Sequence, residues 1–124
     1  MSSAAITIDV DGLDCYRRIH GLPASDGPDP VFTHALPRFF DLLAQQKVRG
    51  TLFLIGADHD KWAEAAQEAV RQGHELASHS YAHDYGMSRW SHTEIAGDLA
   101  RAEDVLSKHQ SEVHGFRAPG YNTS

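Results

Sequence analysis

The sequence predicts an α/β protein in which parallel strands alternate with helices. Short apolar runs that end in polar residues recur along the chain, and segments with an apolar stripe at helical spacing lie between them. The chain has no convincing hairpin turn. Alternation of this kind requires helical crossovers, so the strands are expected to be parallel and the crossovers right-handed. An open sheet and part of a barrel both fit the pattern.

Four segments have the composition of buried strands. Residues 5–10 are rich in β-branched residues, and residues 51–55 form a continuous apolar run of the kind that parallel sheets bury. Residues 75–78 and 113–116 are shorter candidates, so the predicted order is βαβαβαβ. A long polar connection with several glycines and prolines follows the first strand, and we expect it to be a loop.

Three helices are expected between these strands. Their apolar faces are Leu36, Phe39, Phe40 and Leu43; Trp62, Ala65, Ala66, Ala69 and Val70; and Ile95, Leu99, Ala102 and Leu106. Pro37 is tolerated in the first turn of the first helix, where an N–H has no partner to lose. Asp60 is expected to cap the second helix and Gly73 to end it. Ser91 and Glu94 have the spacing of a capping box for the third.

Length and composition indicate one globular domain over residues 1–124, because 41% of the residues are apolar and 23% are charged. The net charge of −6 argues against nucleic acid as the main partner, since phosphate binding needs a basic face. Cys15 is the only cysteine, which excludes an internal disulfide and a multi-cysteine zinc site. The sequence contains no apolar run that would span a membrane and none typical of a signal peptide, so a cytoplasmic protein is expected.

Polar clusters follow three of the predicted strands, at residues 9–11, 79–83 and 117–119. Parallel α/β folds build their sites at the carboxyl edge of the sheet, because several strand ends converge there. The three clusters are therefore expected to form one site.

Asp9 and Asp11 belong to the first cluster. Their spacing of two places both carboxylates on the same side of a strand. Two like charges at such a short distance repel each other, which is costly unless a cation or an arginine lies between them. In the alternative interpretation, Asp11 caps the turn at Gly12 and Asp9 is merely exposed.

The other two clusters supply histidines and an arginine. His79 and His83, four residues apart, can direct both imidazoles at one cation, and zinc accepts imidazole nitrogen and carboxylate oxygen. The alternative is an accidental spacing in a chain with nine histidines. Arg117 can hold a carboxylate ionised and oriented, although a loop arginine on the surface is the commoner case.

Together these clusters resemble the motifs of the NodB-homology polysaccharide deacetylases, also called carbohydrate esterase family 4. TIDVDG (7–12) resembles the first family motif, HSYAH (79–83) matches the second, and FRAPGY (116–121) resembles the third. GTLFLIG (50–56) and GHELASHS (73–80) are similar to the segments that accompany those motifs, in the same order. The resemblance covers essentially the whole chain and implies a distorted (β/α) barrel, of which these residues form the N-terminal half.

The resemblance also implies roles for the clustered residues. Asp11, His79 and His83 would bind a divalent metal, zinc first by ligand type, with cobalt, nickel, manganese or iron as other choices. Asp9 would be the general base, and Arg117 would pair with it.

Further roles follow from the second and third motifs. Ser80 would brace the metal-binding loop by hydrogen bonding. Backbone near Gly120 and Tyr121 would supply an oxyanion contact to substrate. The chain departs from the family where Val10 separates the two aspartates and where Gly120 precedes the aromatic residue.

The implied function is metal-dependent hydrolysis of the N-acyl group of an amino-sugar substrate, which would make the protein a hydrolase acting on a non-peptide C–N bond. The alternatives are a half-domain that binds metal and saccharide or a partner without turnover, and a partly folded truncated product with no function. The family's fourth and fifth motifs, the fifth with its general-acid histidine, have no counterpart before Ser124, and His114 is the remaining candidate acid. We therefore expect little activity from this chain alone and a homodimer formed through exposed sheet edges.

The other histidines are not expected to have a role in the site, and His74 is expected to be a structural hydrogen-bonding residue. Asp58, His59 and Asp60 resemble a metal site only in composition, since Asp60 is expected to be a helix cap.

Overall fold

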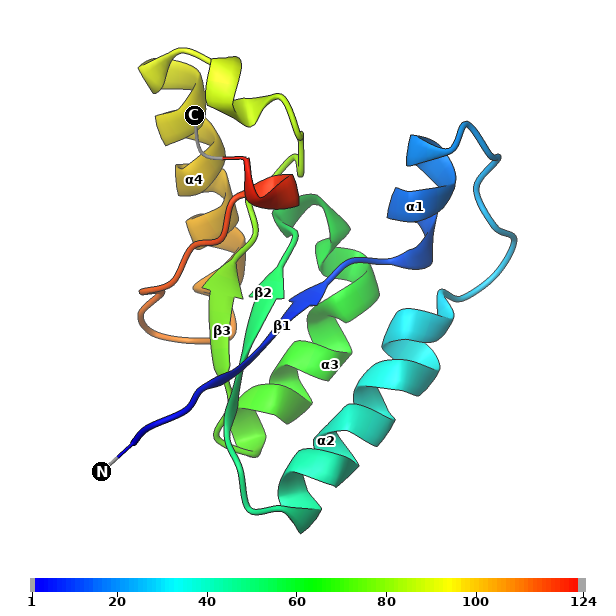
Figure 1. Ribbon diagram of the computed structural model, residues 1–124, viewed down its shortest axis with the longest axis vertical. Coiled ribbons are helices and arrows are strands. Elements are labelled where there is room, and N and C mark those ends of the chain that lie inside the picture. The colour runs from blue at the N-terminus through cyan, green and yellow to red at the C-terminus, as the bar shows by residue number, and fades with distance from the viewer. Residues whose placement is uncertain (1, 123–124) are drawn as a thin grey trace.

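A computed structural model describes residues 2–122 and shows three parallel strands in one sheet with helices packed against it (Figure 1). The strands are β1 (Ile6–Val10), β2 (Gly50–Leu54) and β3 (Glu75–Ser78), in the order β1-β2-β3. Consecutive strands are therefore neighbours, each joined to the next by a helical crossover. The predicted α/β class with parallel strands is confirmed. Residues 1 and 123–124, the ends of the predicted domain, lie outside the described residues.

The helices are α1 (Leu13–Ile19), α2 (Leu36–Gln45), α3 (His59–Arg71) and α4 (His92–Leu106). A π-helical turn (Val31–Ala35) leads into α2, and 3-10 turns occupy Gly56–Asp58, Met87–Arg89 and Pro119–Tyr121. Figure 1 shows α2 and α3 running beside each other and α4 lying along β3. Within the described part of the chain, none of the helices combines the length and the apolar character needed to cross a membrane.

The core lies between the sheet and the helices. Val10, Leu52, Leu54 and Leu76 belong to one buried cluster with Trp62 of α3. The Trp62 side chain is fully buried, and its indole N–H donates to the Ile55 carbonyl at 2.7 Å. This bond satisfies the one polar group that the ring takes into the core. The predicted apolar faces are confirmed at their buried positions, which are Leu36, Phe40, Leu43, Trp62, Ala66, Ala69, Ala102 and Leu106. The prediction was wrong for Val70, which is exposed near the end of α3.

The opposite face of the sheet carries the strand residues that alternate with the core residues, among them Asp9 and Phe53. The chain segment after α4 crosses close to this face. A Cβ on Gly115 would lie 2.9 Å from Cβ of Ala77, so glycine permits the approach. The segment carries Arg117 over the Phe53 ring, with Cζ 4.1 Å from the ring centroid.

The fourth strand expected at residues 113–116 is present only as one parallel bridge, between Ser78 and Phe116. Ser78 N–H donates to the Gly115 carbonyl at 2.8 Å, and Arg117 N–H donates to the Ser78 carbonyl at 2.9 Å. The ladder ends there because Pro119 has no N–H to donate and the chain turns into the last 3-10 turn.

The predicted loop after the first strand was wrong in part, because it contains helix α1. Asp29, a buried residue from the far end of this connection, accepts from Leu13 N–H at 2.7 Å and from Val31 N–H at 3.0 Å. One carboxylate thus caps both α1 and the π-helical turn. This tertiary cap stabilises a helix too short to be stable alone.

The prediction that Asp60 caps α3 was also wrong. The helix begins at His59, with Asp58 at the N-cap and no side-chain cap bond, and Asp60 lies exposed in the first turn. The reason is that the 3-10 turn before it runs directly into the helix and supplies its first turn. Gly73 ends the helix as predicted, with φ of +85°. The capping box of Ser91 and Glu94 on α4 is confirmed.

Candidate metal centre

Three side chains from two segments, one after β1 and one after β3, converge at the carboxyl edge of the sheet. Each of Asp11, His79 and His83 offers one ligand atom, and these atoms all lie within 4.8 Å of one another. Asp11 Oδ1 is 3.6 Å from Nε2 of both histidines, which is too long for a hydrogen bond. Asp11 Oδ1 and His83 Nε2 are consequently buried with no partner. Buried polar atoms are nearly always paired, so this arrangement fits a cation between them.

A hydrogen bond fixes the orientation of His79. Its Nδ1 lies 2.7 Å from the backbone carbonyl oxygen of Arg117. A carbonyl only accepts, so Nδ1 must carry the hydrogen, and in the neutral ring Nε2 then keeps a free lone pair. That lone pair belongs to the nitrogen nearer Asp11, and His79 is almost completely buried. The ring is thus held in the tautomer that a metal ligand needs.

His83 is held neutral by its surroundings. Burial lowers the pKa of this imidazole, an effect that Asp11 opposes and His79 reinforces. The ring meets the Tyr85 ring edge to face, at 5.4 Å between centroids. A neutral imidazole can donate its lone pair to a cation, whereas imidazolium cannot.

The turn between the two histidines has an uncommon backbone. Ser80 and His83 have φ of +68° and +53°, a region that non-glycine residues rarely adopt. The 3-10 turn after β2 supports this turn from one side: Gly56 N–H donates to the Ser80 carbonyl at 3.0 Å and Ala57 N–H to the Tyr81 carbonyl at 2.9 Å. The Ser80 hydroxyl accepts from His83 N–H at 3.1 Å, a contact of the bracing kind expected of this residue.

Asp98 of α4 supports the same turn from the other side, and sequence reasoning missed it. Its Oδ2 accepts from the Ser80 hydroxyl at 2.7 Å and from Tyr81 N–H at 2.8 Å, and its Oδ1 accepts from Ala82 N–H at 2.9 Å. One feature could have identified it: Asp98 lies three residues after Ile95, on the side of the helix predicted to be apolar. An acid at such a position needs buried donors.

Asp9 lies beside the triad in a separate hydrogen-bonded pair. Arg117 Nη1 donates to Asp9 Oδ1 at 2.5 Å, which confirms the predicted contact, and Arg117 Nη2 donates to Thr7 Oγ1 at 2.9 Å. The Tyr121 hydroxyl donates to Asp9 Oδ2 at 3.1 Å, and this bond raises the pKa of Tyr121. Asp9 Oδ2 is also 3.9 Å from His79 Nε2, so the carboxylate borders the triad.

The turn of the third motif places its two candidate oxyanion residues in the left-handed region. Gly120 has φ of +60° and Tyr121 of +55°. Tyr121 N–H donates to the Ala118 carbonyl at 3.1 Å, so this amide is already bonded within the turn. Gly120 packs against Tyr85: a Cβ there would lie 3.1 Å from Cδ1 of that ring.

Other histidines lie outside the triad. His114 is exposed, and its Nε2 lies 3.1 Å from Oε2 of Glu112. His59 Nε2 lies 2.8 Å from His109 Nε2, and Asp58, His59 and Asp60 do not form a ligand group in the part of the chain that the structure describes. His74 is buried and its Nδ1 accepts from Gly50 N–H at 3.1 Å, which confirms its structural role.

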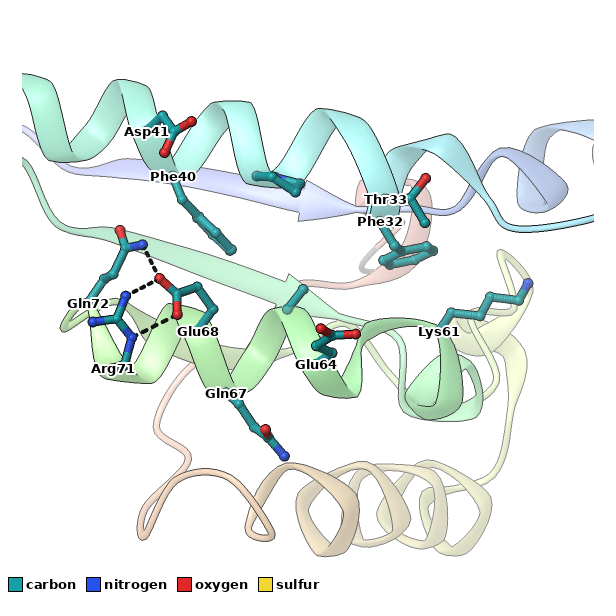
Figure 2. Close-up of a pocket in the computed structure, with 12 residues that line it drawn as sticks. Phe32, Thr33, Phe40, Asp41, Lys61, Glu64, Gln67, Glu68, Arg71 and Gln72 are labelled. Carbon is teal, nitrogen blue, oxygen red and sulfur yellow. Dashed lines mark hydrogen bonds and ion pairs between the residues drawn. The ribbon is translucent and has the colours of Figure 1, made fainter.

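Two pockets differ in their relation to the triad. A pocket of 350 Å³ between α1 and the 82–85 loop is lined by His83, with Ile19 and Tyr85 among its other residues. A larger pocket of 690 Å³ lies between α2 and α3 (Figure 2) and contains none of the triad. On its wall Glu68 accepts hydrogen bonds from the Arg71 guanidinium and the Gln72 side-chain amide.

The fold and the site together describe a parallel α/β protein with a His, His, Asp group at the strand ends. The profile of the polysaccharide deacetylase family matches residues 22–124. The chain therefore belongs to the polysaccharide deacetylase family. The matched range begins after Asp9 and Asp11, which come from β1 and the residues that follow it.

Individual relatives agree with this assignment. A chitooligosaccharide deacetylase of Sinorhizobium fredii is 42% identical over 100 residues, which cover 79% of this chain and 45% of the relative. A peptidoglycan-N-acetylglucosamine deacetylase of Bacillus cereus is 31% identical over 104 residues, which cover 84% of this chain and 47% of the relative. The chain thus spans about half the length of the curated relatives that it matches.

Solved structures match over nearly the whole chain. A family 4 acetyl xylan esterase of Clostridium thermocellum, in complex with a cobalt ion, has a TM-score of 0.69 and 29% identity over 97% of this chain and 50% of its own. A pseudoenzyme of the same family from Bacillus anthracis has a TM-score of 0.73 at 23% identity, covering 97% and 36%, and is similar in fold alone. The expected deacetylase-type α/β fold is confirmed for this part of such a domain.

Proposed function

We propose that this site takes part in metal-dependent hydrolysis of the N-acyl group of an amino-sugar substrate. The convergence of Asp11, His79 and His83 beside the Asp9 and Arg117 pair carries the proposal. Amide hydrolysis needs an activated water, a base for its proton and donors for the developing oxyanion. The names of the curated relatives, deacetylases of chitooligosaccharide and of peptidoglycan N-acetylglucosamine, support this reaction class.

Asp11, His79 and His83 would hold the metal. Two imidazoles and one carboxylate suit zinc first, and cobalt, nickel, manganese and iron accept the same ligands. When bound, a divalent metal would acidify a water molecule and polarise the acyl carbonyl.

Asp9 is the proposed general base. Its Oδ2 borders the triad, and it would accept the proton of water as the water oxygen attacks the acyl carbon. Arg117 on Oδ1 and Tyr121 on Oδ2 would keep the carboxylate oriented for that transfer. The amide C–N bond then breaks, and the leaving amine takes up a proton. Protonated Asp9 is the proposed donor of this proton, because it borders the triad, whereas His114 is exposed and contacts Glu112.

The developing oxyanion needs a donor besides the metal. We propose the N–H of Gly120 for this contact, since the neighbouring amide of Tyr121 already donates to Ala118. The open pocket beside His83 would admit part of the sugar, and Tyr85 offers a ring face at its wall.

A second candidate function is binding of metal and saccharide without turnover. It requires only the converging ligands of the triad and the pocket beside His83, and it does not require Asp9 to act as a base. The two candidates share the triad and differ in what Asp9 does.

One experiment separates them. Acetate release from N-acetylated chito-oligosaccharides is measured with zinc-loaded protein, made as residues 1–124 and as the full product of its reading frame. Hydrolysis that disappears in Asp9→Asn supports the proposed enzyme. Stoichiometric zinc without acetate release in either form supports the second candidate, and failure to bind zinc contradicts both.

We also propose that the 124-residue chain associates, most simply as a twofold dimer. Strand β1 has one neighbour among the described strands, and Ile6 on it is 43% exposed. An open strand edge with apolar side chains favours pairing with another chain. Light scattering that shows a monomer at high concentration would contradict this association.

A cytoplasmic location of the protein stays a prediction.

A further inference from the structure

The acidic residue on α4, Asp98, makes contacts that bear directly on the candidate metal centre. It is 7% exposed and its three donors are the Ser80 hydroxyl and the amides of Tyr81 and Ala82. Every one of these donors belongs to the turn that joins His79 to His83. A buried carboxylate is costly unless donors surround it, and here the donors come from one turn.

The Ser80 hydroxyl passes this contact on to a ligand residue. A hydroxyl has one hydrogen, and Ser80 donates it to Asp98 at 2.7 Å. The oxygen is then left to accept, and it accepts from the backbone N–H of His83 at 3.1 Å. Asp98 thereby fixes both the rotation of the hydroxyl and the position of the His83 backbone.

The turn needs such support because its backbone is unfavourable. Ser80 and His83 both have positive φ, which costs free energy for residues with a Cβ. The hydrogen bonds from Gly56 and Ala57 secure the carbonyl groups of the turn. The Asp98 carboxylate accepts from the amides of Tyr81 and Ala82. Loss of Asp98 therefore leaves a turn that is still bonded at its carbonyls but free to shift at these amides.

We infer that Asp98 is a positioning residue that sets the metal affinity of the triad by holding the 79–83 turn in its ligand-ready conformation. The inference rests on the proposed metal function. A carboxylate on α4 thus couples the packing of this helix against β3 to the spacing of two metal ligands. Partners that orient metal ligands typically change affinity by about 10- to 100-fold when they are replaced.

Zinc affinity, measured by competition with a chromophoric chelator, tests the inference. Asp98→Asn keeps one carbonyl acceptor and should bind zinc about 10-fold more weakly, while Asp98→Ala should approach the 100-fold end of that range. Asp104→Asn, an exposed acid on the same helix, is the matched control and should bind like the wild type. Absorption of the cobalt-substituted protein should change in the Asp98 variants, because it reports ligand geometry, and stay unchanged in the control.

A double-mutant cycle separates positioning from general loss of stability. Since Asp98 and Ser80 act through one hydrogen bond, the double variant Ser80→Ala with Asp98→Ala should lose less zinc-binding free energy than the sum of the two single losses.

Amide hydrogen exchange of the wild type provides a test that needs no variant. Zinc should slow exchange at Tyr81 and Ala82, whose amides donate to Asp98.

The outcomes are distinguishable. Zinc affinity and cobalt spectra that are unchanged in both Asp98 variants overturn the inference while leaving the metal site intact. If the variants do not fold, the absence of zinc-dependent protection at Tyr81 and Ala82 overturns it instead. If the wild type binds no zinc, or if the His83→Ala variant binds zinc as tightly as the wild type, the proposed metal site is wrong. The role of Asp98 is then wrong as well.

Discussion

Arg117 contacts His79 through its backbone and Asp9 through its side chain. The Arg117 carbonyl accepts from His79 Nδ1 at 2.7 Å, and its guanidinium donates to Asp9 Oδ1 at 2.5 Å. The same residue therefore orients a candidate metal ligand and the candidate base. Because one contact uses the main chain and the other the side chain, substitution can separate them.

Replacing Arg117 by methionine should remove only the second contact. The carbonyl remains, so zinc affinity should stay near that of the wild type, whereas acetate release by the active form should fall about 10- to 100-fold as Asp9 loses its orientation. Arg38→Met, a loss of an exposed arginine, is the control. Loss of zinc together with activity would show that the guanidinium also supports the triad.

Replacing His79 and His83 by alanine should abolish stoichiometric zinc binding. Each supplies a nitrogen to the triad, and one carboxylate oxygen is too weak a site for zinc alone. Metal analysis of protein purified without chelator measures the outcome. The exposed pair His20→Ala and His92→Ala removes the same number of imidazoles and should keep the metal. Unchanged zinc in the His79 and His83 variant would show that the triad is not the metal site.

Asp9→Asn should lower turnover by about 10²- to 10⁴-fold, the usual contribution of a general base, and leave zinc content nearly unchanged. The amide still accepts a hydrogen bond but cannot take the proton from water. Tyr121→Phe is a milder comparison, since it removes one donor to Asp9 and keeps the base. Full activity in Asp9→Asn would remove Asp9 as the base, and loss of zinc would identify it as a ligand.

His74 should make stability depend on pH. Burial lowers the pKa of this imidazole, with Arg49 adding to the effect, and the neutral ring accepts from Gly50 N–H. The unfolded chain takes up a proton near pH 6.5 while the folded chain does so only at lower pH. The stabilisation is therefore complete above about pH 6.5 and is lost as the pH falls towards the folded pKa.

Urea unfolding at several pH values measures this effect. His74→Gln keeps a hydrogen-bond acceptor but cannot titrate, so its free energy of unfolding should fall less than that of the wild type between pH 7 and pH 5. An identical slope in the two proteins would show that another group dominates acid sensitivity. Chelator in every sample keeps metal binding out of the comparison.

Gly56→Ala should disturb the 79–83 turn, whereas Gly97→Ala should not. A Cβ on Gly56 would lie 2.7 Å from Cδ2 of Tyr81, 3.1 Å from its Cα and 3.3 Å from Cα of Ala102. Overpacking of this kind costs about 1–3 kcal/mol of folding free energy. Nothing lies within 4 Å of a Cβ at Gly97, a residue of α4, so alanine there should stabilise by about 0.5–1 kcal/mol. Thermal unfolding compares the two, and equal stability would contradict the prediction.

The sequence by itself determined the elements whose patterns are local. Strands β1, β2 and β3 and the apolar faces of α2, α3 and α4 follow from hydrophobic periodicity, which depends only on neighbouring residues. The capping box of Ser91 and Glu94 is equally local. The candidate site was predictable because parallel strands end at one edge, so residues that follow different strands meet there.

The tertiary structure decided what depends on residues distant in sequence. Helix α1 forms because Asp29 caps it from across a connection, and the segment around Phe116 pairs at a single bridge because Pro119 turns the chain away. Asp98 lies in the apolar stripe of α4, and its role depends on three donors in the 79–83 turn, a segment distant from it in sequence. Local patterns specify which backbone conformation a segment adopts, whereas caps, bridges and buried carboxylates are stabilised by partners that only the folded chain brings into contact.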